Sequence, residues 1–217
     1  MKTREYQQNP HLIETESFII IQSIIDELEP NYTFESKVHE AIIKRAIHTT
    51  ADFDYMHSLS FTHDVISKIQ NVILKGGTIF TDTNMALSGI NKKKLKEYNC
   101  DYFCYVGDEK VAAIAKEKGI TRSMAAIEVA AQVEGPKCFV LGNAPTAVYK
   151  ILEMSEDNQL ELDAVVGVPV GFVGAEESKE ELAKSNIPAI AALGRKGGSN
   201  LAAAIINAIL YNMPGCE

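Results

Sequence analysis

The chain has 217 residues and a formal net charge of −8, from 21 lysines and arginines against 29 aspartates and glutamates. Hydrophobic residues make up 46% and charged residues 23%, which is typical of a globular protein and excludes a disordered, collagen-like or disulfide-scaffold chain. The acidic balance argues against a nucleic-acid binder, because such a protein needs a basic surface to displace counterions from phosphates.

The sequence contains neither the apolar core of a signal peptide near its start nor an apolar run of the roughly 18–20 residues that cross a membrane. Its four cysteines are therefore expected to be reduced thiols in the cytoplasm. Cys100 and Cys104 are the only close pair, and their spacing is not CxxC. We expect buried or half-buried thiols there, with no metal or redox site.

The first third of the chain is predicted to be helical. Apolar residues recur at helical spacing between 12 and 28, and Pro30 closes that segment. A second helix is expected over about 34–47. A third is expected from Thr62, as its N-cap, to Lys75, where two glycines stop it. We expect one domain, in which these helices (about 10–76) precede an α/β unit (about 77–213).

In the α/β unit, short apolar runs alternate with longer helical stretches. The expected strands are 78–81, 102–106, 138–141, 164–168 and 189–193, and the expected helices are 110–118, 123–133, 144–154, 177–184 and 199–210. Runs that are apolar throughout suit strands covered on both faces, as in a parallel sheet. The alternation predicts a three-layer α/β/α fold with a mainly parallel sheet.

Glycine-rich segments follow several of these strands, at the sheet edge where ligands of parallel sheets bind. Two of them, 142–146 and 194–199, lead directly into helix starts, whose free N–H groups attract anions. Arg195 and Lys196 add positive charge. Ordinary βα turns are the alternative. Neither GxxxxGK[ST] nor GxGxxG is present, so a phosphate-binding nucleotide site is weakly supported.

Three arginines lie near these helix ends and loops. Arg45, Arg122 and Arg195 suit bidentate binding of carboxylates, or each pairs with a surface Asp or Glu. The fourth, Arg4, falls in an expected frayed terminus.

Among the five histidines, His48 stands out because it ends the second predicted helix, with Asp52 nearby. The helix dipole favours its charged form, so it suits a general acid, although local chemistry alone favours a structural histidine. The other four are expected at the surface or at helix caps. No GxSxG and no histidine pair with metal-ligand spacing occurs, so neither a nucleophile nor a metal site is expected.

Over nearly its whole length the chain resembles the precorrin-8X methylmutases, isomerases of the cobalamin pathway, and their cobalt-precorrin-8 counterparts. The proline-valine-glycine-phenylalanine run with its Glu-Ser-Lys tail is the most specific marker. The residues that carry the resemblance are Pro10 with Glu16-Ser17-Phe18, Arg45-Ala46-Ile47-His48-Thr49-Thr50, Asp82 with Met85, Thr121-Arg122-Ser123, Gly142-Asn143-Ala144-Pro145-Thr146-Ala147, the run 167–179, and Gly194-Arg195-Lys196-Gly197-Gly198-Ser199.

The resemblance implies a cofactor-free isomerase that moves a methyl group from carbon 11 to carbon 12 of ring C in a suprafacial sigmatropic shift. The product is hydrogenobyrinate, or cobyrinate from the cobalt-bearing substrate. It also implies a homodimer with sites near the subunit interface, a flavodoxin-like sheet, and His48 as the active-site histidine. The expected substrate-binding residues are Ser17, Arg45, Thr49, Asp82, Arg122, Asn143, Thr146, Gly171, Arg195, Lys196 and Ser199.

This substrate is a large macrocycle fringed with acetate and propionate groups, which needs an apolar platform and several carboxylate binders. The arginines and helix starts suit the carboxylates, and Phe172 with its neighbours suits the apolar face. Two rivals remain: a flavodoxin-like nucleotide or flavin enzyme, and a corrinoid carrier that binds the same ligand without turnover. No nucleic-acid or membrane partner is expected.

Overall fold

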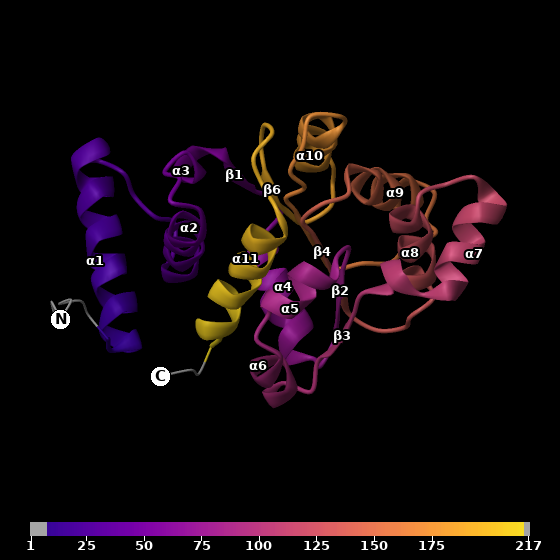
Figure 1. Ribbon diagram of the computed structural model, residues 1–217, viewed down its shortest axis with the longest axis horizontal. Coiled ribbons are helices and arrows are strands. Elements are labelled where there is room, and N and C mark those ends of the chain that lie inside the picture. Colours follow the sequence, from indigo (N-terminus) through magenta and orange to yellow (C-terminus); the bar gives the residue numbers. More distant parts are fainter. Residues whose placement is uncertain (1–7, 215–217) are drawn as a thin grey trace, which may run out of the picture.

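A computed structural model describes residues 8–214 as an α/β protein built on one six-stranded sheet (Figure 1). The strand order is β1-β6-β5-β4-β2-β3; β1 runs antiparallel to β6, and all other neighbours are parallel. The strands are β1 (Leu59–Phe61), β2 (Thr78–Thr81), β3 (Asp101–Phe103), β4 (Lys137–Leu141), β5 (Ala164–Gly167) and β6 (Ala189–Ala192). The five parallel strands have the flavodoxin-like order, which confirms the expected fold class.

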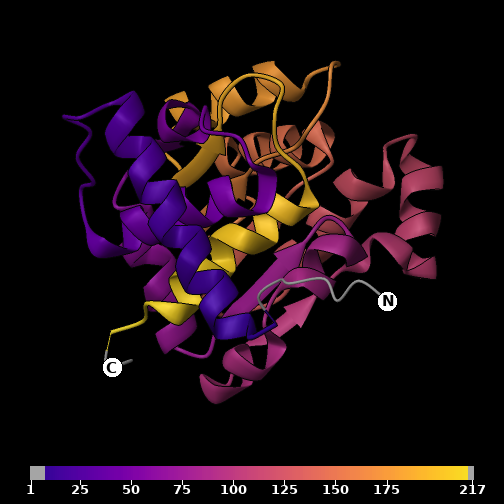
Figure 2. The ribbon, with the colours of Figure 1, turned by 60° about the vertical axis from the view of Figure 1, so that its left-hand side comes forward.

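The helices cover both faces of this sheet. They are α1 (Pro10–Leu28), α2 (Lys37–Thr50), α3 (Tyr55–Ser58), α4 (Val65–Leu74), α5 (Asn84–Gly89), α6 (Lys92–Glu97), α7 (Glu109–Lys118), α8 (Arg122–Ala131), α9 (Pro145–Glu156), α10 (Ala175–Lys184) and α11 (Ser199–Tyr211), with a short 3-10 helix, η1 (Tyr105–Gly107). One face packs against α4, α5 and α11, and the other against α8, α9 and α10. Outside α11 lies α2, and outside α2 lies α1, the outermost layer in Figures 1 and 2.

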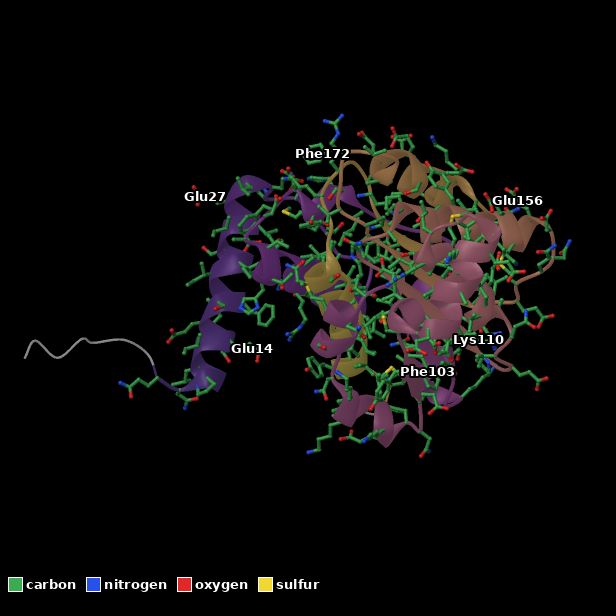
Figure 3. The ribbon with its side chains drawn as sticks, turned by 45° about the vertical axis from the view of Figure 1, so that its right-hand side comes forward. Glu14, Glu27, Phe103, Lys110, Glu156 and Phe172 are labelled. Carbon is green, nitrogen blue, oxygen red and sulfur yellow. The ribbon has the colours of Figure 1, made fainter. Side chains whose placement is uncertain are left out.

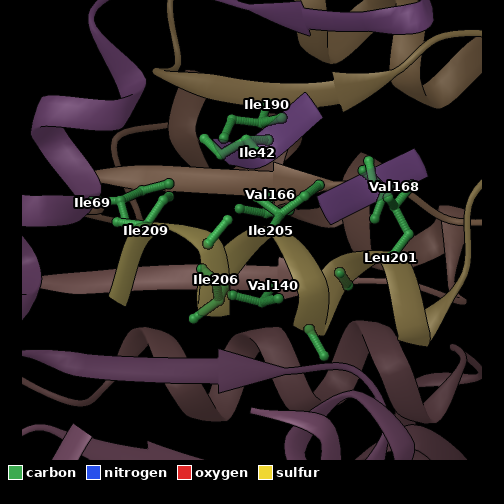
Figure 4. Close-up of a cluster of buried hydrophobic side chains, with 14 of the residues drawn as sticks. Ile42, Ile69, Val140, Val166, Val168, Ile190, Leu201, Ile205, Ile206 and Ile209 are labelled. Carbon is green, nitrogen blue, oxygen red and sulfur yellow. The ribbon is translucent and has the colours of Figure 1, made fainter. Parts of the chain in front are cut away.

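Helix α11 occupies the centre of the larger core. Its sequence is apolar around most of its circumference, as expected of a helix that is buried on nearly all sides. Figure 4 shows Ile205 beside Val166 and Ile206 beside Val140 of the sheet, with Leu201 beside Val168, while α2 covers the opposite side of the helix. This packing fixes the start of α11 at the carboxyl-end edge of the sheet.

The N-terminal third differs from the helical expectation at β1, which pairs with β6 at the edge of the sheet. Three residues are too short a run to give a strand periodicity. Thr62 follows this strand and does not cap a helix: its hydroxyl accepts a hydrogen bond from the Ala189 N–H at 3.1 Å, and the helix begins at Val65.

Three further details differ from the prediction. The second helix is capped by Ser36, begins at Lys37 and runs to Thr50, so His48 lies inside its last turn. The strand expected over 102–106 ends at Phe103, and the chain continues as η1. The short helices α5 and α6 follow β2 where no element was expected. Their six residues each are too few to show an amphipathic pattern.

None of the helices between residues 8 and 214 is long and apolar enough to cross a membrane. Cys100 and Cys138 are buried free thiols and Cys104 is a partly exposed one, whereas Cys216 lies outside the described residues. Burial raises the pKa of the Cys100 thiol to about 11 and raises that of Cys138 further. Both thiols are therefore protonated and unreactive at neutral pH.

Candidate active site

The loops that follow β2, β4, β5 and β6 pack against one another at one edge of the sheet. The Thr83 and Ser199 hydroxyls are 2.8 Å apart, which joins the end of β2 to the start of α11. A Cβ at Gly142 would lie 2.6 Å from the Ser199 Cα, so only glycine lets the loop after β4 approach this helix so closely. The loops singled out by their glycines therefore do converge.

Asp82 lies at the centre of this edge, buried between β2 and β4. Its carboxylate accepts hydrogen bonds from the backbone N–H groups of Gly142 at 2.9 Å, Asn143 at 2.7 Å and Ala144 at 2.7 Å. Burial raises the pKa of Asp82, and the three N–H donors oppose that rise. The anion site expected before α9 is thus filled by the protein's own carboxylate.

This position is also where the strand order reverses, which is where flavodoxin-like folds bind their nucleotide. Because Asp82 already engages the three N–H groups, no amide cradle is left there for a phosphate. The arrangement argues against the flavin or nucleotide alternative. It also turns the Asp82 carboxylate toward the loop backbone, away from any ligand at the surface.

His48 faces a cavity of about 360 Å³ between α2, α5 and α11. The helix that carries it ends at Thr50, and its C-cap residue Ala51 adopts a left-handed conformation with φ of 55°. The His48 imidazole is solvent-exposed, and its ring centroid is 5.3 Å from that of Phe18 in α1. The cavity is lined by Arg45, His48, Thr49, Met85, Gly89, Asn200, Ala203, Ala204 and Asn207.

The cavity thus brings together Arg45, His48 and Thr49, three of the expected site residues. Sequence reasoning did not assign Asn200, which lies in the first turn of α11. Its signal was its place in the first turn of a helix that begins directly after the Gly197-Gly198 pair. Met85 is one of the residues that carry the family resemblance, but it was not among the expected substrate-binding residues. Its side chain is 72% exposed and lines this cavity.

The three arginines differ in their partners. Arg45 binds Glu14 at 2.9 Å and stacks over the Phe18 and Tyr211 rings. The other two lie in the expected strand-end segments. Arg195 lies 3.4 Å from Glu176 and 5.9 Å from the centroid of the Phe172 ring. Arg122 is exposed at the start of α8 and forms no ion pair with any residue of the described chain. Pairing with carboxylates therefore holds for two of them, and Arg4 lies outside the described residues.

Lys196 is committed to other protein groups. Its ammonium bridges Asp52, at 2.6 Å, and Asp54, and these hydrogen bonds raise the pKa of Lys196. Both aspartates follow closely after His48 in the chain. The bridge joins the loop after β6 to the segment after α2. The two aspartates also neutralise the positive charge of Lys196. Ser17 similarly donates its hydroxyl to the Ile13 carbonyl within α1.

A second group of expected residues lies along the same edge but outside the His48 cavity. The Thr121 and Thr146 hydroxyls are 3.0 Å apart, so the starts of α8 and α9 adjoin and Arg122 lies beside them. Asn143 is exposed above the buried Asp82. Gly171 lies in the middle of the loop after β5 and has a φ of 153°.

The loop after β5 presents apolar side chains to solvent. Phe172 is 85% exposed and Val173 is 90% exposed. Figure 3 shows Phe172 at the surface of the molecule. Large apolar side chains this exposed are candidates for contact with a ligand or another protein.

One other histidine differs from expectation. His39 is buried, not at the surface, and its ring packs 4.6 Å from that of Phe61. Burial lowers its pKa, so it is a neutral core residue. His57 and His63 are exposed, as expected. Among residues 8–214, no group of three or more His, Cys, Asp or Glu side chains is arranged to hold a metal ion.

These features define a flavodoxin-like α/β protein with a strand-end site in which a histidine, exposed arginines and apolar side chains face solvent. Residues 12–212 match the family model described as Precorrin-8X methylmutase. The chain belongs to this family, which confirms the resemblance seen in its motifs, and it is an isomerase of cobalamin biosynthesis.

Relatives and solved structures agree with this assignment. The chain is 53% identical over 209 residues to "Cobalt-precorrin-8 methylmutase" of Salmonella typhimurium, covering 96% of this chain and 98% of the relative. It is 31% identical over 211 residues to "Precorrin-8X methylmutase" of Sinorhizobium sp, covering 96% and 98%. The solved precorrin-8x methyl mutase of Thermus thermophilus superposes with a TM-score of 0.78 at 29% identity, covering 91% of this chain and 95% of that one.

Proposed function

We propose that this chain moves a methyl group from carbon 11 to carbon 12 of ring C of cobalt-precorrin-8, giving cobyrinate. The observation that carries the proposal is the exposed imidazole of His48 in a cavity shared with Arg45 and Thr49. The cobalt-bearing form is supported by the names of the relatives. Those at 53%, 39% and 37% identity are cobalt-precorrin-8 methylmutases, whereas two at 31% and 35% are precorrin-8X methylmutases.

The reaction is intramolecular: one carbon–carbon bond breaks, another forms on the neighbouring carbon, and no co-reactant is consumed. It needs no nucleophile or hydride. The barrier falls when electron density is drawn away from the migrating centre, and a charged histidine can do so by donating a proton to the ring C nitrogen. In the cobalt-bearing substrate the nitrogens are already ligated. There His48 donates a hydrogen bond to a peripheral carboxylate, or orients the ring.

The rest of the macrocycle needs contacts beyond the cavity, which at about 360 Å³ holds only part of a tetrapyrrole. Arg122 and Arg195 are the exposed cations suited to its peripheral carboxylates. Met85, Phe172 and Val173 offer apolar surface for its faces. Ser17 and Lys196 are less suited to direct contact, because their polar groups already bind protein atoms. Asp82 acts through the loop that it holds.

We also propose that the protein acts as a homodimer in the cytoplasm. The outermost helix, α1, exposes a group of large apolar side chains. Single exposed apolar residues are normal on a protein surface, but a group on one helix indicates an interface. The residues of this group are Leu12, Ile13, Ile19, Ile20 and Leu28. A second copy that covers α1 would lie close to the His48 cavity, because the His48 ring centroid is 5.3 Å from that of Phe18 in α1.

Oligomeric state is measured by sedimentation of the full chain at micromolar concentration, with a dimer expected. Ile20→Glu, at a side chain 58% exposed, should shift the protein toward monomer. Leu74→Glu, at an exposed side chain on α4, is the matched control and should stay dimeric. A parent chain that sediments only as monomer contradicts the dimer.

Activity is tested by incubating the protein with cobalt-precorrin-8 and with metal-free precorrin-8, and following the visible absorption spectrum. The methyl shift alters the conjugation of the ring, so turnover changes the spectrum. We expect turnover, faster with the cobalt form. Saturable binding without any spectral change would favour the carrier alternative. A preference for FMN or NAD over corrinoid would favour the nucleotide alternative.

A further inference from the structure

Lys179, in α10, is a buried lysine that the reaction described above does not use. Its side chain is 0% exposed, although lysine is almost never fully buried unless it is paired. Within the described residues it forms no ion pair, and its Nζ donates a hydrogen bond to the Lys196 carbonyl at 2.7 Å. Burial lowers the pKa of Lys179 to about 8, and the charge of Glu176 opposes this only in part.

Such a residue costs folding stability. Removing an ammonium from water without a counter-ion at hydrogen-bond distance is unfavourable, and an apolar side chain of similar volume would fill the same space at lower cost. The one thing that the amine supplies and an apolar side chain does not is the hydrogen bond to the Lys196 carbonyl. Lys179 therefore acts on the loop that contains this carbonyl.

That loop, 194–198, is hydrogen-bonded to the loop 168–174 that follows β5, and we call the two together the paired loops. The Gly171 N–H donates to the Arg195 carbonyl at 3.1 Å, and the Gly198 N–H donates to the Val168 carbonyl at 2.9 Å. A Cβ at Gly197 would lie 2.2 Å from the Val168 oxygen, so the contact requires glycine there. Lys179 binds the carbonyl between these two links.

The paired loops carry groups that the proposed function gives to the substrate. Arg195 is on one loop and Phe172 is on the other, with the guanidinium 5.9 Å from the ring centroid. The Lys196 side chain ties the same loop to Asp52 and Asp54, beyond the end of the helix that carries His48. Lys179 thus binds the backbone of the loop 194–198, and the two aspartates bind the side chain of Lys196 in the same loop.

We propose that Lys179 is a positioning residue that holds the paired loops where Arg195 and Phe172 meet the rim of the bound macrocycle. The inference rests on the proposed function, because it assumes that the corrinoid lies against these loops. Lys179 itself touches no substrate. Its effect falls on binding, whereas His48 acts on the rate of the methyl shift.

The test is Lys179→Met, with Lys184→Met as the matched control on the exposed side of the same helix. We expect Lys179→Met to remain folded with an equal or higher Tm. Its KM for cobalt-precorrin-8 should rise by about tenfold, which corresponds to the loss of one charge-assisted contact made by Arg195. Its kcat should change by less than about threefold. Hydrogen exchange at the amides of Gly171 and Gly198 should accelerate, and Lys184→Met should match the parent in every measurement.

A purely structural role predicts a lower Tm with unchanged KM in the folded fraction, which would overturn the inference. If Lys179→Met does not fold, Lys179→Gln replaces it, since it keeps a shorter N–H donor. Failure of both to fold also overturns the inference, because Lys179 would then stabilise α10 itself. Absence of turnover in the parent contradicts the proposed function instead. Turnover in the parent with unchanged KM and exchange in Lys179→Met contradicts this inference alone.

Discussion

The carboxylate of Asp82 and the backbone N–H of Ala144 form a 2.7 Å hydrogen bond that joins the end of β2 to the start of α9. The sequence predicts that this helix start attracts an anion, and that physical reasoning is sound. The occupant is a carboxylate brought from 62 residues earlier in the chain. A pattern of glycines and a proline identifies the attraction but does not identify which negative group satisfies it.

Asp82→Asn should destabilise the fold and loosen the loop after β4. An amide offers one acceptor oxygen and turns its NH₂ toward N–H donors, so at least one donor loses its partner. Leaving a buried donor unsatisfied costs about 1–3 kcal/mol. Urea unfolding measures the loss, with Asp108→Asn, at the exposed N-cap of α7, as the control. An unfolding free energy equal to that of the parent would show that the three hydrogen bonds contribute nothing.

Arg122 and Arg195 should each contribute to the affinity for the corrinoid. Loss of a charge-assisted hydrogen bond should weaken binding by about 1.5–3 kcal/mol in Arg122→Ala and in Arg195→Ala. Lysine should restore only part of it, because it lacks the bidentate fork. Isothermal titration with cobyrinate measures the affinity, and Lys184→Ala, a cation in an exposed ion pair with Glu180 at the end of α10 away from the strand-end loops, is the control. Parent-like affinity in both folded alanine variants would remove the arginines from the site.

Lys179 should make folding stability depend on pH in a characteristic direction. The pKa of Lys179 is about 8 in the folded chain and near its usual 10.5 in the unfolded chain, so between these values the unfolded state binds more protons. The contribution of Lys179 to the unfolding free energy therefore rises with pH across this window, by up to about 1.4 kcal/mol per pH unit.

The Lys179→Met variant lacks this contribution. Its stability advantage over the parent should be largest below pH 8 and should shrink as the pH approaches the usual lysine value of 10.5. Denaturant unfolding of both proteins at several pH values gives the difference directly, and Lys184→Met shows how much an exposed lysine changes it. A difference that stays constant with pH would mean that Lys179 titrates like a surface lysine.

Local sequence patterns predicted the parallel sheet because the buried strands β4, β5 and β6 are short, mostly apolar runs close to glycine or proline. They did not predict β1, since its three residues acquire a strand conformation only by pairing with β6. The site shows the same division. His48 stood out by its place at a helix end, but only the family resemblance gave it a catalytic role, and the bridge from Lys196 to Asp52 depends on a contact across more than 140 residues of chain. Whether a charged side chain stays available to a ligand depends on partners that are distant in the sequence. Local patterns in a single sequence do not reveal those partners.

His48 should govern the rate of the methyl shift and not the affinity for the ring. Its imidazole is exposed in the last turn of α2, packed at 5.3 Å against Phe18, in a cavity where only part of the macrocycle fits. Histidine can donate a proton or a hydrogen bond near neutral pH, and general acid assistance of this kind is worth about 10²–10⁴-fold in rate.

His48→Ala should therefore bind cobyrinate with near-parent affinity and show a large loss in single-turnover rate. The loss should be greater for metal-free precorrin-8, whose ring nitrogen is open to protonation, than for the cobalt form, whose nitrogens are ligated. His48→Gln separates the two roles, because it keeps a hydrogen-bond donor but delivers no proton: it should rescue the cobalt substrate more than the metal-free one. His57→Ala, at an exposed histidine on α3, is the control. An unchanged rate in His48→Ala would remove this residue from the mechanism and leave substrate positioning as the source of catalysis.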